Sequence, residues 1–350
     1  MVVTAKMVKE LRTATDAPMM DCKKALVEAE GNMDKAKDIL RDKGMSKAAK
    51  KGDRVAAEGL LRISVSDDFK SVTMAEINSE TDFVAKNVGF QNLVQETADF
   101  FHNSSATSVE EVLKGSYKDS TFSEYFGTET GKIGEKIVAR RFAKLSGDVA
   151  NAYVHSNGKV AVLISLETDK PAEMQKIAKD IAMHAAAMKP TILSYKDFSA
   201  EFIAEETKGR IEAIKTENEE LLRLKKPLKN VPQFISMFQL TDEVIATAKA
   251  KIEAELKAQG KPEKIWDRIV PGKIERFIAD NTTLDKELAL LDQNYVMDDS
   301  LSIAQAIDKE AKKFGGTAKL VGYIRYELGE GVEKKVELSF AEEVAAQTGN

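Results

Sequence analysis

The sequence predicts an α+β protein in which a small helical module precedes a core of two related halves. Two observations lead to this prediction. At Gly59 the spacing of apolar residues changes from the three-to-four-residue steps of helices to the alternation of strands. A second alternating stretch begins near Ala152 and is again followed by a helical stripe, so a hairpin-plus-helix pattern occurs twice in the chain.

Residues 1–44 predict three short helices that share a thin core. Their apolar stripes are Val8 and Leu11; Cys22, Ala25, Leu26 and Ala29; and Ala36, Ile39 and Leu40. Pro18 suits the first turn of the second helix, because its missing N–H would have no partner there. Gly31 and Gly44 are expected to end the second and third helices. The basic run 45–55 then reads as a solvated linker.

The first half of the core is predicted to be a hairpin followed by a helix. Two alternating stretches flank the pair Asp67-Asp68, which predicts the turn of the hairpin. The alternating residues are Leu61, Ile63 and Val65, then Val72, Met74 and Ile77. The helical stripe that follows is Phe90, Leu93, Val94, Ala98 and Phe101.

The second half repeats this order. Residues 152–155 and 160–164 flank Asn157-Gly158, a common tight-turn pair, and therefore predict a second hairpin. Its helix has the stripe Met174, Ile177, Ile181 and Ala185. The two hairpins even end in the same letters, Glu80-Thr81-Asp82 and Glu167-Thr168-Asp169. We expect each sheet to be covered by helices on one face and to leave its other face available.

A helical arm is predicted to interrupt the second half. Two helical stripes are separated by Pro227 and Pro232, and we expect them to pair as an antiparallel hairpin along a narrow seam. The stripes are Ile211, Ile214, Asn218 and Leu221, then Ile245, Ala248, Ile252 and Leu256. Residues 319–326 predict a strand that returns to the core, and residues around 340–346 a short last helix.

These patterns predict that the chain is divided into six parts. They are 1–54 (helical module and linker), 55–145 (core half one), 146–198 (first part of core half two), 199–275 (helical hairpin arm), 276–335 (completion of core half two) and 336–350 (C-terminal module).

Composition argues against several classes of function. The 52 basic and 57 acidic side chains leave a formal charge of −5, which gives no footprint for DNA. Cys22 is the only cysteine, and the three histidines lie far apart, so neither a disulfide nor a metal site is expected. No secretory signal and no run of about 20 apolar residues is seen, which favours a cytoplasmic protein with no membrane contact. No phosphate-binding G-x-x-x-x-G-K-[ST] loop occurs, so direct nucleotide binding and cofactors are not expected.

The segment 81–87, TDFVAKN, lies where a strand passes into a helix and is the most informative motif. Asp82 is expected to cap the turn by accepting backbone N–H bonds. Phe83 has two interpretations: it fills the local core, or it is an aromatic anchor at a loop tip, aimed at the pocket of a partner. Met19 lies three residues before Cys22 and is expected in the core, whereas Met20 is expected to be partly exposed.

Six blocks of the sequence resemble the elongation factor Ts family, in the right order and over nearly the whole chain. They are 7–32 (MVKELRTATDAPMMDCKKALVEAEGN), 81–87 (TDFVAKN), 132–141 (KIGEKIVARR), 180–190 (DIAMHAAAMKP), 260–277 (GKPEKIWDRIVPGKIERF) and 321–334 (VGYIRYELGEGVEK). The first two are specific to the family, and the others support them.

The resemblance implies both a fold and a task. It implies a ubiquitin-associated-like three-helix N-terminal module, a two-part core, an antiparallel coiled coil and a C-terminal module. It also implies a guanine-nucleotide exchange factor in translation elongation, which binds elongation factor Tu, promotes GDP release by disturbing the magnesium and phosphate site, and leaves when GTP rebinds. No covalent chemistry is implied.

The resemblance also assigns residues that contact elongation factor Tu. In the family the positions that match Asp82 and Phe83 contact the GTPase domain, and the phenylalanine wedges between its helices. The full set of positions that match the family's contacts is Thr81, Asp82, Phe83, Val84, Arg12, Met19, Met20, Lys23, Ile133, Gly134 and His155.

One part of the sequence departs from the family. The arm between about 199 and 260 is longer than the compact hairpin typical of the family, and the apolar run 231–240 has no family counterpart. Two other functions compete with the exchange factor. A helical module on a scaffold with an arm also fits a binding adaptor, which would not need the segment 81–87. An enzyme would need Cys22 as a nucleophile with a histidine base close in space.

Overall fold

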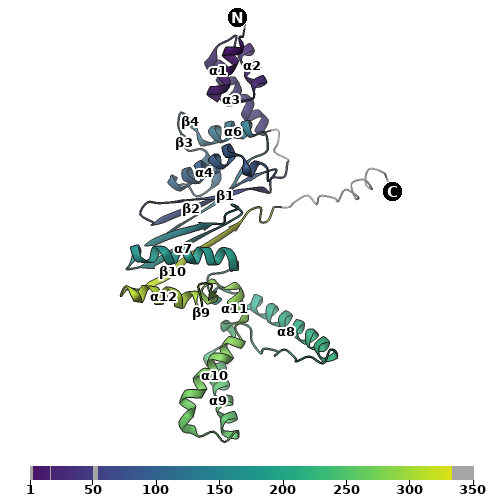
Figure 1. Cartoon of the computed structure of the whole chain (residues 1–350), viewed down its shortest axis with the longest axis vertical. Helices are drawn as coiled ribbons and strands as arrows, with labels where there is room; N and C mark the ends of the chain where they lie inside the picture. Colours follow the sequence, from purple (N-terminus) through teal and green to yellow (C-terminus); the bar gives the residue numbers. More distant parts are fainter. Residues whose placement is uncertain (1–2, 16, 50–53, 333–350) are drawn as a thin grey trace, which may run out of the picture. The chain divides into compact units, whose positions relative to one another are not determined.

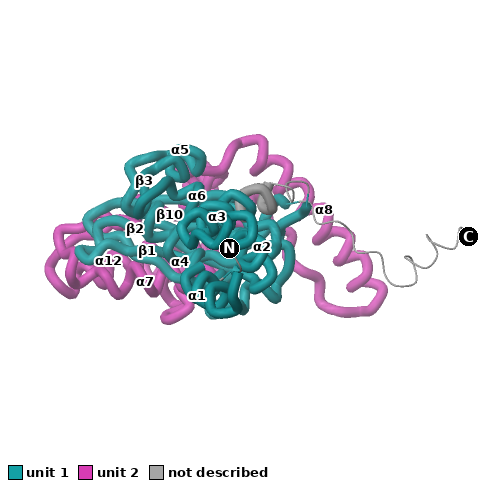
Figure 2. The backbone as a smooth tube through the Cα atoms, turned by 90° about the horizontal axis from the view of Figure 1, so that it is seen from above, with its two compact units in different colours: residues 1–164, 324–350 teal, residues 165–323 magenta. Residues whose placement is uncertain are grey.

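The chain is described here by a computed structural model that covers residues 3–15, 17–49 and 54–332 (Figure 1). The fold divides into two compact units, residues 1–164 with 324–350 and residues 165–323 (Figure 2). The mixture of helices and strands confirms the α+β class. The short helix expected around 340–346 lies outside the described residues. Within those residues, no helix is both long and apolar enough to cross a membrane.

The N-terminal module consists of three helices, as predicted. They are α1 (Ala5–Thr15), α2 (Met19–Glu28) and α3 (Met33–Ala49). The stripes of α1 and α2 and Ala36 of α3 form their common core, and Cys22 lies fully buried in it. Gly44 does not end the third helix, which continues to Ala49 and takes in the first residues of the expected linker. A single glycine inside a helix costs only about 1 kcal/mol relative to alanine, so it need not end the helix.

The first sheet has three strands in the order β1-β2-β5 and confirms the first predicted hairpin. Its strands are β1 (Glu58–Val65), β2 (Ser71–Ser79) and β5 (Val138–Ser146). Leu60, Ala75 and Ile77 on one face pack against the buried stripe of α4 (Val88–Asn103), as the stripe predicts. Between α4 and β5 lie α5 (Val109–Leu113), β3 (Ser116–Tyr117), β4 (Ser120–Thr121) and α6 (Phe122–Ile133).

The second sheet repeats the strand order of the first. Its order is β10-β7-β6. In each sheet the third strand in the sequence, β5 or β10, pairs with the second strand of the hairpin, β2 or β7. The strands are β6 (Val149–Val154), β7 (Val160–Thr168) and β10 (Ala318–Glu327), and α7 (Pro171–Met188) follows β7 with its predicted stripe buried. The repeated order supports the predicted duplication, and β10 is the predicted returning strand.

The expectation that each sheet leaves one face available is wrong for the first sheet. Leu61, Val72 and Met74 point away from α4 and form a second core cluster. They share it with residues of β6 and β7, namely Ala150, Ala152, Ala161 and Leu163. Strand β1 therefore buries Leu60 on one side and Leu61 on the other, because neighbouring residues of a strand face opposite ways. The two sheets pack face to face as a sandwich.

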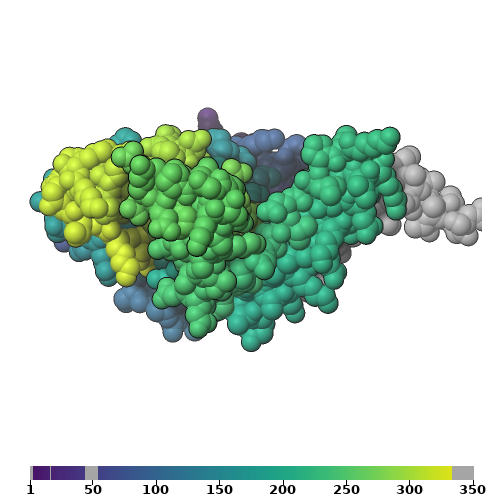
Figure 3. Space-filling model, turned by 90° about the horizontal axis from the view of Figure 1, so that it is seen from below, coloured from purple at the N-terminus to yellow at the C-terminus, as the bar shows by residue number. Residues whose placement is uncertain are grey.

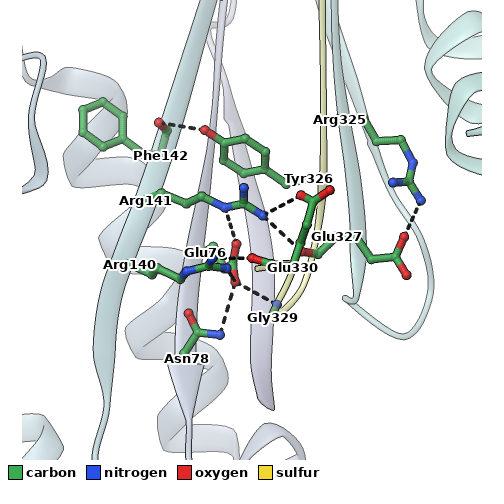
Figure 4. Close-up of polar contacts among 10 residues, drawn as sticks. All are labelled: Glu76, Asn78, Arg140, Arg141, Phe142, Arg325, Tyr326, Glu327, Gly329 and Glu330. Carbon is green, nitrogen blue, oxygen red and sulfur yellow. Dashed lines mark hydrogen bonds and ion pairs between the residues drawn. The ribbon is translucent and has the colours of Figure 1, made fainter. Parts of the chain in front are cut away.

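A buried carboxylate ties the first sheet to the end of β10 (Figure 4). Glu76 on β2 is fully buried, and a β-bulge opposite it gives β5 one extra residue, since Glu76 pairs with Arg141 while Ile77 pairs with Ala139. Consecutive strand residues normally face opposite sides, but a bulge re-aims one of them. Both guanidinium groups therefore reach the same carboxylate: Arg140 Nη1 lies 2.8 Å from Glu76 Oε1 and Arg141 Nε 2.5 Å from Oε2.

The same cluster holds residues that follow β10. The Gly329 N–H donates to Glu76 Oε1 at 2.9 Å, and Arg141 Nη2 donates to the Glu327 carbonyl at 3.1 Å. Gly329 has φ +72°, and a Cβ there would lie 2.4 Å from the Ala57 carbonyl oxygen, so only glycine fits. Burial alone would raise the pKa of Glu76, but the hydrogen bonds from Gly329, Arg140 and Arg141 outweigh it and hold the pKa below its ordinary value.

The second unit contains the arm and the remaining helices. Its elements after α7 are α8 (Ala200–Arg223), α9 (Asp242–Ala258), α10 (Trp266–Asp280), α11 (Thr283–Leu288), β8 (Asn294–Tyr295), β9 (Asp298–Ser302) and α12 (Ile303–Lys313). His184 of α7 is buried, and its ring lies 2.9 Å from the Gln293 side-chain oxygen. Burial lowers the pKa of His184 more than this hydrogen bond raises it.

The predicted pairing of the two arm helices is wrong. Helix α9 packs against α10, where Ala248, Ile252 and Phe277 line a common groove. Helix α8 extends on its own beside the segment that follows it, and Figure 3 shows the two projections as separate lobes. Asn218 exchanges two hydrogen bonds with the backbone of Lys229, at 2.8 and 2.7 Å. The polar partner of Asn218 is thus the segment that follows α8 and not α9, and the stripe of α8 stays only partly buried.

We predict that Glu76→Gln lowers the free energy of unfolding by about 3 kcal/mol, because it leaves two arginines without their buried counter-charge. Urea denaturation measures this loss. Glu330→Gln is the matched control: this exposed carboxylate also pairs with Arg141, at 3.1 Å, and its loss should lower stability by less than about 1 kcal/mol. Equal losses in both variants would contradict the special role of Glu76.

The lowered pKa of Glu76 predicts how stability depends on pH in wild type and in Glu76→Gln. A carboxylate whose native pKa is lowered stabilises the fold fully above its unfolded pKa of about 4.3, and this contribution is lost as the pH falls through the native pKa. Wild type should therefore lose stability in acid more steeply than Glu76→Gln does. Parallel acid denaturation curves for the two proteins would contradict this expectation.

Candidate partner-binding site

The turn between β2 and α4 presents Phe83 to solvent. Strand β2 ends at Ser79, and a short 3₁₀ helix, η1 (Val84–Lys86), leads into α4. The Phe83 side chain is 75% exposed, whereas Val84 beside it is buried in the cluster beneath α4. Of the two interpretations of Phe83, the core-filling one is therefore wrong. Val84 anchors the turn, and Phe83 projects from it.

Asp82 does not cap the turn as expected. Asn87 has this role, because its side-chain oxygen accepts from the Phe90 N–H at 3.1 Å at the start of α4. The Asp82 carboxylate is exposed and lies 3.9 Å from Lys86 Nζ. Lys86 Nζ in turn lies 5.7 Å from the centre of the Phe83 ring, within the range of a cation–π contact. The exposed ring is thus accompanied by one acidic and one basic group.

A second loop lies beside the Phe83 turn. Helix α6 ends at Ile133, and Gly134 adopts φ +87°, the left-handed conformation that favours glycine at this position. Glu135 then accepts two hydrogen bonds from Thr81: Oε2 lies 2.9 Å from the Thr81 N and Oε1 lies 2.6 Å from its hydroxyl oxygen. The structure therefore brings the predicted residues Ile133 and Gly134 next to the segment 81–84.

The predicted residues of the N-terminal module lie on α1 and at the start of α2. Arg12 and Lys23 are exposed. Met19 and Met20 are 56% and 59% exposed, which matches the expectation for Met20 and overturns the one for Met19. Met19 is the first residue of α2, and the buried stripe begins only at Cys22, so Met19 lies beyond the end of the shared core. The result is a pair of neighbouring exposed thioethers.

His155 lies apart from both groups, in the turn between β6 and β7. It is exposed, and its Nδ1 lies 3.2 Å from the hydroxyl oxygen of Tyr153. The predicted contact residues thus form three sets within the first unit: the paired loops around Phe83 and Gly134, the exposed face of α1 and α2, and the turn at His155. Glu80 and Glu135 were not among the predicted site residues, although Glu80 directly precedes the motif 81–87 and Glu135 lies within the motif 132–141.

The geometry gives no support to catalysis by Cys22. The thiol is fully buried and lies 3.5 Å from the Ala17 carbonyl oxygen. A thiol in this position acts as a small apolar residue. The part of the chain that the structure describes also contains no cluster of His, Cys, Asp and Glu side chains able to hold a metal ion.

Comparison with known proteins gives a consistent family assignment. A family model described as Elongation factor TS matches residues 80–330. Elongation factor Ts of Helicobacter pylori (strain HPAG1) is 53% identical over 351 residues, which cover 99% of each chain. Elongation factor Ts of Campylobacter curvus (strain 525.92) is 52% identical over 355 residues and 100% of each chain.

We predict that the two polar residues of the turn differ in their effect on stability. Asn87→Ala should lower the free energy of unfolding by about 1 kcal/mol, because it removes the N-cap of α4. Asp82→Ala should change it by less than about 0.5 kcal/mol, since an exposed ion pair contributes little. Urea denaturation of the two variants checks both values. A larger loss for Asp82→Ala than for Asn87→Ala would reverse the assignment of the cap.

Proposed function

The chain belongs to the elongation factor Ts family and is a translation elongation factor, and we propose that it acts as the guanine-nucleotide exchange factor of elongation factor Tu. In this proposal it binds elongation factor Tu with GDP, promotes release of the GDP and leaves when GTP binds. The chain itself binds no nucleotide, uses no cofactor and catalyses no covalent step. It would work in the cytoplasm, where translation takes place.

The exposed ring of Phe83 is the observation that carries the proposal. A large aromatic side chain in water is energetically unfavourable, and exposed aromatic residues are typical anchors of protein interfaces. Phe83 projects from a turn that is fixed by the buried Val84 and by the N-cap at Asn87. The ring can therefore enter a pocket of a partner with little further loss of conformational freedom.

Exchange requires a difference in binding rather than chemistry. GDP on a GTPase is held by the backbone of the phosphate loop, a lysine and Mg²⁺. A factor that binds the nucleotide-free GTPase better than the loaded form weakens nucleotide binding, and by linkage nucleotide expels the factor. Each 1.4 kcal/mol by which the factor favours the release transition state accelerates release about tenfold. One buried aromatic anchor contributes on the order of 2–4 kcal/mol, so Phe83 alone would account for one to three powers of ten.

The other predicted residues would extend the interface. Met19 and Met20 offer flexible, polarisable side chains that adapt to an apolar surface. Ile133 and Gly134 lie on the loop that adjoins the Phe83 turn, so they would meet the same domain of the partner. The remaining proposed contacts are Arg12, Lys23, Thr81, Asp82 and His155. Val84 was also predicted as a contact, but its side chain is buried, so it would support the turn from within. His155, in the turn between β6 and β7, would reach another domain of the partner.

We predict that wild-type protein accelerates release of a fluorescent GDP analogue from elongation factor Tu and that Phe83→Ala lowers this rate at least about tenfold. Stopped-flow fluorescence with excess unlabelled GDP measures the rates. The fold should remain intact, because the ring touches no core cluster. Phe314→Ala is the matched control, since Phe314 is also an exposed phenylalanine but lies directly after α12 in the second unit.

Two results would contradict the proposal. If wild-type protein leaves the rate of release unchanged, the exchange function is wrong, and binding without acceleration would indicate an adaptor. If Phe83→Ala releases GDP as fast as wild type, exchange does not depend on the exposed ring.

A further inference from the structure

Two carboxylates hold the Phe83 turn and the neighbouring loop in a reciprocal arrangement. Glu80, at the end of β2, accepts the backbone N–H of Lys136 at 2.5 Å. Glu135, just before β5, accepts the backbone N–H of Thr81 at 2.9 Å and its hydroxyl at 2.6 Å. Each loop thus supplies one acidic side chain that binds the backbone of the other. We call this pair of carboxylates, Glu80 and Glu135, the loop clamp.

The loop clamp begins where the pairing of the two strands ends. The last paired residues of β2 and β5 are Asn78 and Val138. Beyond them the backbone groups of the two loops have no ladder partners, and the carboxylates take their place. Arg54 donates to both oxygens of Glu80, at 3.3 and 3.1 Å, and so holds this side chain in its orientation. Lys136 Nζ donates to the Arg54 carbonyl oxygen at 2.8 Å and closes the network.

The position of the loop clamp separates it from the core. Thr81 and Glu135 are only partly buried, and neither belongs to a hydrophobic cluster. Hydrogen bonds at such a site contribute little to global stability. They do fix the backbone at Thr81, two residues before the exposed Phe83, and at Lys136, two residues after the exposed Gly134.

We propose that Glu80 and Glu135 are positioning residues that hold the Phe83 turn in the orientation required for exchange, with Glu135 as the principal one. This inference rests on the proposed function. Neither residue needs to contact the partner. Their effect is to order the turn in the free protein, so that binding energy goes into the displacement of nucleotide rather than into ordering the loop.

The proposal is tested with Glu135→Gln in the fluorescent-GDP release assay, with the concentration of this protein varied to saturation. The glutamine keeps the shape of the side chain but removes its negative charge, so its hydrogen bonds to Thr81 are weaker than the charge-assisted bonds of the carboxylate. We expect the maximal rate of release to fall about tenfold while the melting temperature stays within about 2 °C of wild type. Glu129→Gln is the control: its carboxylate pairs with Lys132 on the same helix, at 2.8 Å, and it should exchange like wild type.

A double-mutant cycle shows whether Glu135 acts through Phe83. If it does, Glu135→Gln has little further effect in the Phe83→Ala background, so the two losses do not add. Fully additive losses, or a wild-type maximal rate in Glu135→Gln, would overturn the inference while the dependence on Phe83 keeps the proposed function intact. If wild-type protein fails to accelerate release at all, the proposed function and this inference fall together.

Discussion

The structure of the first unit depends on the burial of the Glu76 carboxylate between two arginines. A lone buried charge is strongly unfavourable, so the fold must supply partners for it from every side. Arg140 and Arg141 come from β5 through a β-bulge, and the Gly329 N–H comes from the segment after β10. The ion cluster therefore fixes the register of β2 and β5 and joins both to the end of the returning strand.

The Glu76 cluster also affects the candidate site, because the two loops of that site directly follow β2 and directly precede β5. Four residues after Glu76 the chain enters the segment with Glu80 and Thr81, and the loop with Gly134 and Glu135 leads directly into β5. Firm pairing of the strands sets the distance between the two loops. The loop clamp then fixes their backbones, and Val84 fixes the turn from below. Phe83 stays exposed because the buried Val84 and the loop clamp hold the backbone of the turn.

Local patterns in the sequence predicted local structure, and they failed where the result depended on packing between distant segments. The alternation around Leu61 and the stripe around Phe90 gave the hairpin and α4, because each pattern reflects burial against the nearest element. The predicted pairing of α8 with α9 was wrong, because α9 packs against α10 and Asn218 of α8 bonds to Lys229 in the segment that follows it. The periodicity of the apolar residues does not reveal these partners. The bulge at Arg140 could not be predicted from the sequence either, because it depends on the register in which β2 pairs with β5. The motif identified Phe83 as a candidate but left open whether its side chain is buried or exposed. In the structure Val84 fills the local core, and Phe83 is therefore exposed.

In the proposed function, the exposed Phe83 turn distinguishes nucleotide-free elongation factor Tu from its GDP-bound form. The most direct measurement is the affinity of this protein for elongation factor Tu with and without GDP, by titration calorimetry of each form. We expect this protein to bind the nucleotide-free form about 100-fold more tightly than the GDP-bound form. Equal affinity for the two forms would contradict it, because a factor without such a preference cannot displace nucleotide.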